Sequence, residues 1–311
     1  MPMRKVFIVL LGLVLLLAGC STSTSTGVRV VVSTNILGDV VSTIVTCGGG
    51  STEVLMPIGA SAHDFSVSSQ QVADMTAADL VVLNGLELES GLEKVIQNVK
   101  AEGGEVFEVG ETINPLEVSS DGSVDEHSHD EDHDHGEFDP HFWLDMSRMA
   151  LASIAIGDKL KSLTGDHAYS TCAQDTSAEI LAAERELKKS LDSIPSSSRL
   201  LVVDHESFNY FASAYDFEVI GSIIPSISDN AQPSSEDLAA LVQIIQERNV
   251  KAIFVSSDNT KKLADALKSE IGKPIGVVRL YEGSLGMKNS AADTYIKMML
   301  FNAKAISKAL S

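Results

Sequence analysis

The chain has 311 residues, of which 44% are hydrophobic, and its 43 Asp and Glu against 23 Lys and Arg give a formal net charge of −20. This apolar content suffices for one large domain or two medium ones, which excludes a disordered acidic tail and a disulfide-stapled miniprotein. Because nucleic-acid binding requires clustered Lys and Arg that release counterions, the charge also excludes a nucleic-acid partner.

The N-terminus has the pattern of an export signal. An apolar run at 6–17 follows two basic residues and is shorter than the roughly 20 residues that span a membrane. It ends in Leu-Ala-Gly before Cys20, which resembles a lipoprotein signal. We expect residues 1–19 to be removed and Cys20 to be lipidated, placing the chain on the extracytoplasmic face of the cell membrane. The polar residues 20–27 then form a flexible tether.

Alternating strand and helix patterns follow. Short β-branched runs predict strands at 28–33, 53–57, 80–83 and 106–109, and apolar periodicity predicts helices at 36–47, 68–78 and 90–101. Apolar strands between helices are typical of a parallel sheet covered on both faces. We therefore expect an N-terminal α/β lobe over residues 28–164.

A helical stretch separates this block from the next. Asp145 is the expected N-cap, and Gly165 divides the stretch so that its second helix, at about 169–193, is long. A helix of about 25 residues spans roughly 37 Å, the width of a domain. We interpret residues 165–195 as a rigid helical link between two lobes; the alternative is one continuous sheet with a helical insertion.

A second α/β block completes the chain. Strands are predicted at 200–203, 219–224, 252–255 and 276–280, with helices near 206–214, 235–248, 259–271 and 290–309. This block defines a C-terminal lobe over residues 196–311. Because open α/β sheets bind ligands beyond the carboxyl ends of their strands, two facing lobes create a cleft for a ligand.

Two cysteines remain beyond the export signal, Cys47 and Cys172. In an oxidising compartment they can form a disulfide. Their separation in sequence carries no information on their geometry, so two buried free thiols remain the alternative.

Half of the eight histidines lie in an acidic loop at residues 121–138. They are His127, His129, His133 and His135. With many acids, no basic residue and almost no apolar one, the segment is expected to be a solvated loop. We expect it to capture divalent metals weakly, because it imposes no fixed geometry; the alternative is a charged loop without a role.

Three further histidines share a different placement: His63, His141 and His205 all fall where the cleft between the lobes is expected. Three converging neutral imidazoles suit zinc, whereas manganese prefers more oxygen donors. Carboxylates adjoining such imidazoles can fix their tautomers, although each can equally cap a helix or be solvated. The three candidates are Asp64, Asp139 and Asp204.

Six segments, taken in order, carry a family resemblance. They are MPIGASAHDFSVSSQQV, ADLVVLNGLELESGLEKV, DPHFWLD, VVDHESFNYFASAYDFEVIG, PSSEDLAALVQIIQERNVKAIFV and LYEGSLG. The chain resembles the metal-binding lipoproteins that serve zinc and manganese ABC importers. The resemblance implies two α/β lobes joined by a long backbone helix, with a metal in the cleft held by His63, His141 and His205. Manganese-type members tend to have Glu in place of His205, so the chain resembles the zinc branch.

Three positions depart from the family pattern. Ala62 replaces a Pro before the first ligand histidine, and Ser256 replaces a Glu. The late Asp of the family falls on Gly283, with Glu282 one residue earlier. The fourth ligand is therefore either Glu282, reaching the metal from a shifted backbone, or a water.

The expected function is that of a monomeric, lipid-anchored solute-binding protein and not of an enzyme. It captures zinc, or alternatively manganese, and delivers it to the permease and ATPase of an ABC importer. One competing hypothesis is a surface zinc hydrolase with a three-His site, a metal-bound water and Glu206 as base. Another is a manganese-binding lipoprotein that acts in cell adhesion.

Overall fold

The computed structural model describes residues 27–118, 138–256 and 258–311. The predicted signal sequence, Cys20 and the four histidines of the acidic loop (His127, His129, His133 and His135) lie outside these ranges. Within them, no helix is both long enough and apolar enough to cross a bilayer.

The N-terminal lobe is built on a parallel sheet with the strand order β2-β1-β3-β4. Its strands are β1 (Arg29–Val32), β2 (Ser51–Val54), β3 (Leu80–Leu83) and β4 (Val106–Glu108). The central strands β1 and β3 are almost wholly buried, as expected for valine-rich runs covered on both faces. Val30 pairs with Thr52 on one side and Leu80 on the other, so β1 lies at the centre of the lobe.

The C-terminal lobe repeats this topology with the strand order β6-β5-β7-β8. Its strands are β5 (Leu200–Val203), β6 (Glu218–Ser222), β7 (Ala252–Val255) and β8 (Gly276–Arg279), and all pairs are parallel. The expected two-lobe α/β fold is therefore confirmed, and the alternative of one continuous sheet is wrong. In each sheet the chain reverses its strand order between the first and third strands, which is where such folds bind ligands.

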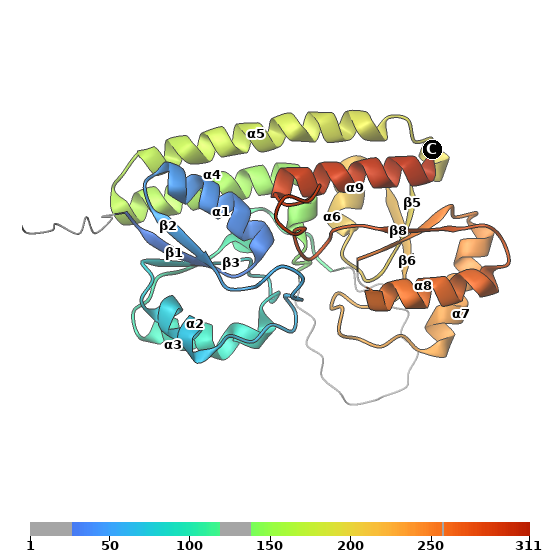
Figure 1. The fold of residues 1–311 in the computed structure, drawn as a ribbon, viewed down its shortest axis with the longest axis horizontal. Helices are drawn as coiled ribbons and strands as arrows, with labels where there is room; N and C mark the ends of the chain where they lie inside the picture. Colours follow the sequence, from blue (N-terminus) through green and yellow to red (C-terminus); the bar gives the residue numbers. More distant parts are fainter. Residues whose placement is uncertain (1–26, 119–137, 257) are drawn as a thin grey trace, which may run out of the picture.

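Helices cover both sheets (Figure 1). They are α1 (Asn35–Cys47), α2 (Ser69–Thr76), α3 (Glu93–Ala101), α4 (Met146–Thr164), α5 (Ala168–Leu191), α6 (Asn209–Tyr215), α7 (Ser235–Glu247), α8 (Asp258–Ile271) and α9 (Tyr295–Leu310). Short 3₁₀ turns accompany them: η1 (Ser90–Leu92), η2 (Val109–Thr112), η3 (Phe142–Leu144) and η4 (Ser196–Ser198).

The long helix α5 runs along both lobes (Figure 1) and packs against α1, α4 and α9. Its 24 residues correspond to about 36 Å. Asp145 caps α4 by accepting hydrogen bonds from the backbone N–H groups of Ser147 and Arg148, and Gly165 ends α4 in a left-handed conformation with φ +75°. Cys47, the last residue of α1, forms a disulfide with Cys172 of α5, their Cα atoms 6.0 Å apart. The link is thus anchored to the N-terminal lobe by packing and by a covalent bond.

Some element bounds differ from the expected ones for local reasons. Strand β2 begins at Ser51, two residues earlier than expected, because its register is set by pairing with β1. Helix α6 begins at Asn209 and not near 206, because a turn in which Ser207 N–H donates to His205 O precedes it. Helix α9 begins only at Tyr295, after Thr294 accepts a hydrogen bond from Lys297 N–H as the N-cap.

Candidate metal site

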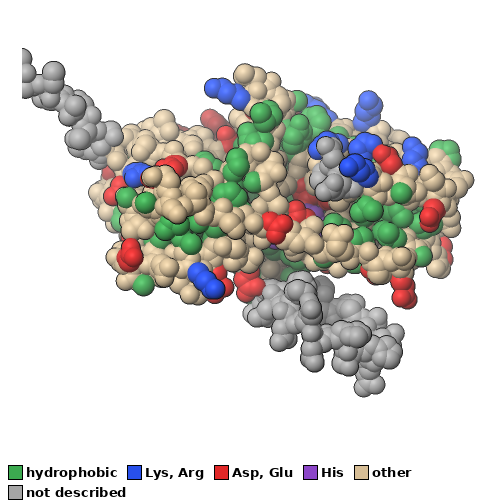
Figure 2. Space-filling view, turned by 60° about the horizontal axis from the view of Figure 1, so that its bottom comes forward, with side chains coloured by type: hydrophobic (Ala, Val, Ile, Leu, Met, Phe, Trp, Pro, Cys, Tyr) green, Lys and Arg blue, Asp and Glu red, His purple; other side chains and the backbone are tan. Residues whose placement is uncertain are grey.

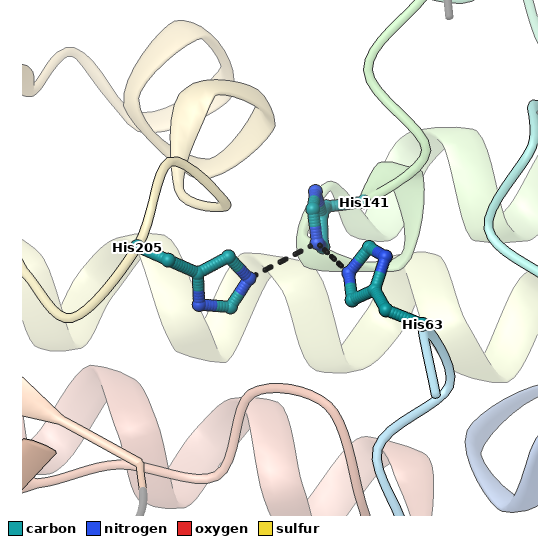
Figure 3. Close-up of side chains that lie close together, drawn as sticks. All are labelled: His63, His141 and His205. Carbon is teal, nitrogen blue, oxygen red and sulfur yellow. Dashed lines mark hydrogen bonds between the residues drawn. The ribbon is translucent and has the colours of Figure 1, made fainter. Parts of the chain in front are cut away.

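Three imidazoles from distant parts of the chain converge between the lobes (Figure 3). His63 lies on the loop after β2, His141 directly precedes η3, and His205 follows β5. The Nε2 atom of His141 is 3.4 Å from Nε2 of His63 and 3.3 Å from Nε2 of His205. One nitrogen from each ring lies within 4.8 Å of the other two.

This spacing fits a metal ion. In a tetrahedral zinc site with Zn–N bonds of about 2.0–2.1 Å, neighbouring nitrogens are about 3.3–3.4 Å apart. Both Nε2–Nε2 distances lie in that range. The nitrogens of His63 and His205 therefore each lie at the spacing from His141 that two ligands of one tetrahedral ion require, and within 4.8 Å of each other.

Buried neighbours hold these loops in place. Ala62, before His63, is 8% exposed, and Phe142, after His141, is fully buried. The turn after His205 is closed by its own backbone, since the carbonyl of His205 accepts from Ser207 N–H. Packing thus restrains the residues next to His63 and His141, and a backbone turn restrains His205.

Asp139 orients the imidazole of His141. Its Oδ1 accepts hydrogen bonds from both Nδ1 (2.8 Å) and the backbone N–H (2.9 Å) of His141, which leaves the Nε2 lone pair to face the other two rings. Asn209 donates to the second oxygen of Asp139 at 3.1 Å, and Tyr210 donates to its backbone carbonyl at 2.8 Å. Because both donors belong to α6, the C-terminal lobe helps to aim a histidine of the N-terminal lobe.

Glu282 brings a carboxylate beside His205 from the loop after β8, and its oxygen lies within 4.8 Å of ligand atoms of His205 and Asp204. It is 2% exposed, and its Oε1 lies 3.0 Å from Nε2 of His205. Trp143 Nε1 donates to its backbone carbonyl at 2.8 Å, which holds the loop in this position. In the described part of the chain, Oε1 is a buried oxygen without an aligned hydrogen-bond donor. A cation beside the three rings would give Oε1 of Glu282 the partner that a buried oxygen requires.

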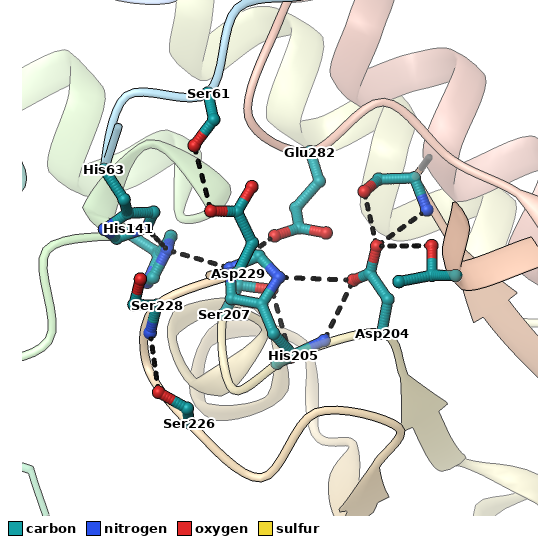
Figure 4. A network of polar contacts seen from close by, with 12 residues as sticks. Ser61, His63, His141, Asp204, His205, Ser207, Ser226, Ser228, Asp229 and Glu282 are labelled. Atoms are coloured by element: carbon teal, nitrogen blue, oxygen red, sulfur yellow. Dashed lines mark hydrogen bonds and ion pairs between the residues drawn. The ribbon is translucent and has the colours of Figure 1, made fainter. Parts of the chain in front are cut away.

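Asp204 positions His205 through hydrogen bonds. Its Oδ1 accepts the backbone N–H of His205 at 3.0 Å, and its Oδ2 accepts the backbone N–H of Ser256 at 2.8 Å and the hydroxyl of Ser256. The Nδ1 atom of His205 lies 3.4 Å from Oδ1. Ser256 therefore fixes the carboxylate of Asp204, which lies next to His205 (Figure 4).

Burial and charge set the protonation of the site. Burial lowers the pKa of His63 to about 2 and lowers that of His141, so both rings are neutral. Burial also acts to lower the pKa of His205, but Glu282 and Asp204 outweigh it and raise the value to about 9. Burial and the charge of Asp204 raise the pKa of Glu282 well above its usual range. Without a cation, the pair of His205 and Glu282 therefore retains a proton near neutral pH.

Asp64 occupies a different position from Asp139 and Asp204. Its side chain is exposed, and its Oδ1 accepts a hydrogen bond of 2.6 Å from Asn230 of the C-terminal lobe. The contact is thus made across the cleft to the opposite lobe.

Asp229 is a residue of the site that the sequence interpretation missed. It lines the cavity between the lobes, of about 580 Å³, together with His63, His141, His205 and Glu282. Its Oδ1 accepts a hydrogen bond from Ser61 Oγ at 2.9 Å (Figure 4). Topology offers a signal, because Asp229 follows β6 as His63 follows β2, the equivalent edge strand of the other sheet.

The site is recessed. His141 and His205 are 1% and 5% exposed, whereas His63 is partly exposed. Figure 2 shows histidine only as a small area between the two halves, while acidic and basic side chains are scattered over the rest of that face. An ion held by all three rings would be largely removed from water.

Comparison with known proteins identifies related chains. The family model described as "Zinc-uptake complex component A periplasmic" matches residues 30–309. The manganese-binding lipoprotein MntA of Halalkalibacterium halodurans is 28% identical over 312 residues, covering 97% of each chain. The zinc-binding protein TroA of Treponema pallidum is 28% identical over 300 residues, covering 94% of this chain and 92% of the relative.

Solved structures agree with this relationship. The periplasmic zinc-binding protein TroA of Treponema pallidum superposes with a TM-score of 0.78 at 27% identity, covering 92% of this chain and 99% of the other. A manganese-bound mutant of a periplasmic metal-binding protein from Candidatus Liberibacter asiaticus gives 0.78 at 25% identity, covering 91% and 99%. Relatives with the same fold thus carry the names of two different metals.

Proposed function

The chain belongs to the ZnuA family, component A of zinc-uptake complexes, and from this premise we propose that it captures zinc outside the membrane and delivers it to an ABC importer. Its relatives are metal-binding lipoproteins of such importers. The observation that carries the proposal is the pair of Nε2–Nε2 distances of 3.3 and 3.4 Å, which match the spacing of ligands around one tetrahedral ion.

The donor set supports zinc over manganese. Three imidazole nitrogens and one carboxylate form a nitrogen-rich site, whereas manganese prefers oxygen donors. We propose that His63, His141 and His205 are ligands and that the carboxylate of Glu282 takes the fourth position. With that position filled, no open site remains for a metal-bound water, which argues for a transport protein over a hydrolase.

Delivery requires release, and the placement of the ligands suits it. His63 and His141 come from the N-terminal lobe, and His205 and Glu282 from the C-terminal lobe. Separating the lobes would divide the ligand set in two. We propose that a monomer anchored through Cys20 hands the metal to the permease of an importer driven by an ATPase, with the acidic loop as an accessory capture segment.

Calorimetric titration of the purified exported chain with Zn²⁺ tests the proposal. The wild type should have one tight Zn²⁺ site, and His63→Ala, His141→Ala and His205→Ala should each abolish it. Deletion of residues 121–138 should leave this tight site intact and remove only weak binding. His167→Ala, at an exposed histidine before α5, is the matched control and should bind as the wild type does.

Two results would overturn the assignment. A tight site that survives all three substitutions and disappears with the loop would place the metal in the loop. Tighter binding of Mn²⁺ than of Zn²⁺ in parallel titrations would reassign the metal.

A further inference from the structure

Two hydrogen bonds between the lobes flank the most exposed imidazole of the site. Ser61, two residues before His63, donates to Asp229 Oδ1 at 2.9 Å. Asp64, one residue after His63, accepts from Asn230 Nδ2 at 2.6 Å. Two consecutive residues of the C-terminal lobe thus hold the loop on either side of a proposed ligand.

Asp229 and Asn230 lie on a loop that is also hydrogen-bonded to the chain next to another proposed ligand, His205. The backbone N–H of Glu206, the residue after His205, donates to Ser226 O at 2.9 Å. Ser226 Oγ then accepts from Ser228 N–H at 3.1 Å (Figure 4), and Ser228 Oγ accepts from Asn230 N–H at 3.3 Å. The loop 226–230 is therefore held in place relative to His205.

Contacts between the lobes around His141 have a different character, because they are buried. Tyr210 donates to Asp139 O at 2.8 Å, and Trp143 donates to Glu282 O at 2.8 Å. Breaking a buried hydrogen bond costs more than breaking an exposed one, whose groups can bond to water instead. The lobes should therefore part first on the His63 side, where all of Asp64, Asp229 and Asn230 are exposed.

We propose that Ser61, Asp64, Asp229 and Asn230 are positioning residues that hold His63 against the metal and set the rate at which the metal leaves. The inference rests on the proposed function, since it assigns these residues to the same site. Breaking both bonds releases residues 61–64, while Gly59 N–H still donates to Ser284 Oγ at 2.8 Å, so His63 can move away from the ion. Two imidazoles and Glu282 then remain, a weaker ligand set from which a partner can take the metal.

The dissociation rate of Zn²⁺, measured by stopped flow with a chelator in excess, tests the inference. Ser61→Ala and Asn230→Ala each remove one bond and should accelerate release about 3- to 10-fold, the range expected for one hydrogen bond. Gln97→Ala is the matched control, because it removes an exposed hydrogen bond of 2.9 Å to Glu93 on α3. Its rate should equal that of the wild type.

A swap separates positioning from charge. Asn230→Asp alone sets two carboxylates face to face and should accelerate release at least as much as Asn230→Ala. Combining it with Asp64→Asn restores a donor and an acceptor in reversed order and keeps the wild-type net charge, so the rate should return to within about twofold of wild type.

The outcomes distinguish this inference from the proposed function. A wild-type chain that binds no Zn²⁺ with 1:1 stoichiometry contradicts the function itself. If all variants bind one Zn²⁺ but release it at the wild-type rate, the positioning role is wrong and the function stands. A double swap that remains as fast as Asn230→Asp also overturns the positioning role.

Discussion

Glu282→Gln tests whether Glu282 is the fourth metal ligand. The question arises because Gly283 stands where the family resemblance places an Asp. The change keeps the size of the side chain and leaves the bond from Trp143 Nε1 to the backbone carbonyl of residue 282 intact. It replaces the carboxylate, whose Oε1 lies 3.0 Å from Nε2 of His205, with a neutral amide. Any loss of binding therefore reports on the carboxylate and not on the loop.

The expected loss follows from burial and charge. A buried interaction with a charged group contributes about 1.5–3 kcal/mol, so the Kd for Zn²⁺ should rise about 10- to 100-fold. The number of protons released when the metal binds provides a second measure. Because the pKa values of both His205 and Glu282 are raised, the pair holds a proton that the cation must displace, and the wild type should release about one proton per metal near pH 7.

Calorimetry in two buffers of different ionisation enthalpy measures both quantities. Proton release should fall in Glu282→Gln, because His205 has lost the carboxylate that contributes most to raising its pKa. Glu218→Gln serves as the control, since that exposed carboxylate pairs with Arg248 at 2.7 Å, outside the site. A Kd within about twofold of wild type, with unchanged proton release, would refute Glu282 as a ligand.

Three further predictions concern support, pH and the disulfide. Asp139→Asn weakens the partner of His141 Nδ1 and should reduce Zn²⁺ affinity about 10- to 100-fold in the same titration; an unchanged affinity would contradict its orienting role. Burial lowers the pKa of His63 to about 2, whereas an unfolded histidine titrates near 6.5, so the unfolded state binds more protons as the pH falls. The free energy of unfolding of the metal-free protein, measured in urea, should therefore fall below about pH 6.5, by up to about 2 kcal/mol at pH 5, and His63→Gln should reduce that slope. Replacing both Cys47 and Cys172 with Ala removes the disulfide between residues 125 apart and should lower the free energy of unfolding, measured in urea, by about 3–5 kcal/mol. An unchanged free energy of unfolding would show that the disulfide does not constrain the unfolded chain.

Much of the fold could be predicted from local sequence because its signals are local. The apolar runs at β3, β5 and β7 formed strands with the expected bounds, since short continuous apolar runs between helices are typical of strands buried on both faces. Asp145 and Gly165 mark the two ends of α4 as expected, because helix caps depend on the conformation of a few consecutive residues.

The sequence by itself also determined which histidines to consider. His63, His141 and His205 were separated from the acidic cluster by their placement after strands or before a helix, and the structure brings these three together. Position at the carboxyl end of a parallel strand can be read from the order of elements, because the topology places those ends at one edge.

Only the tertiary structure decided the direction of each side chain and the contacts between lobes. It paired Cys47 with Cys172, turned Glu282 toward His205, and placed Asp64 against Asn230. It also revealed Asp229, which bonds to a residue 168 positions away. Such contacts follow from how two lobes pack, and neither periodicity nor neighbouring residues encode the distance between loops that meet only after both sheets have folded.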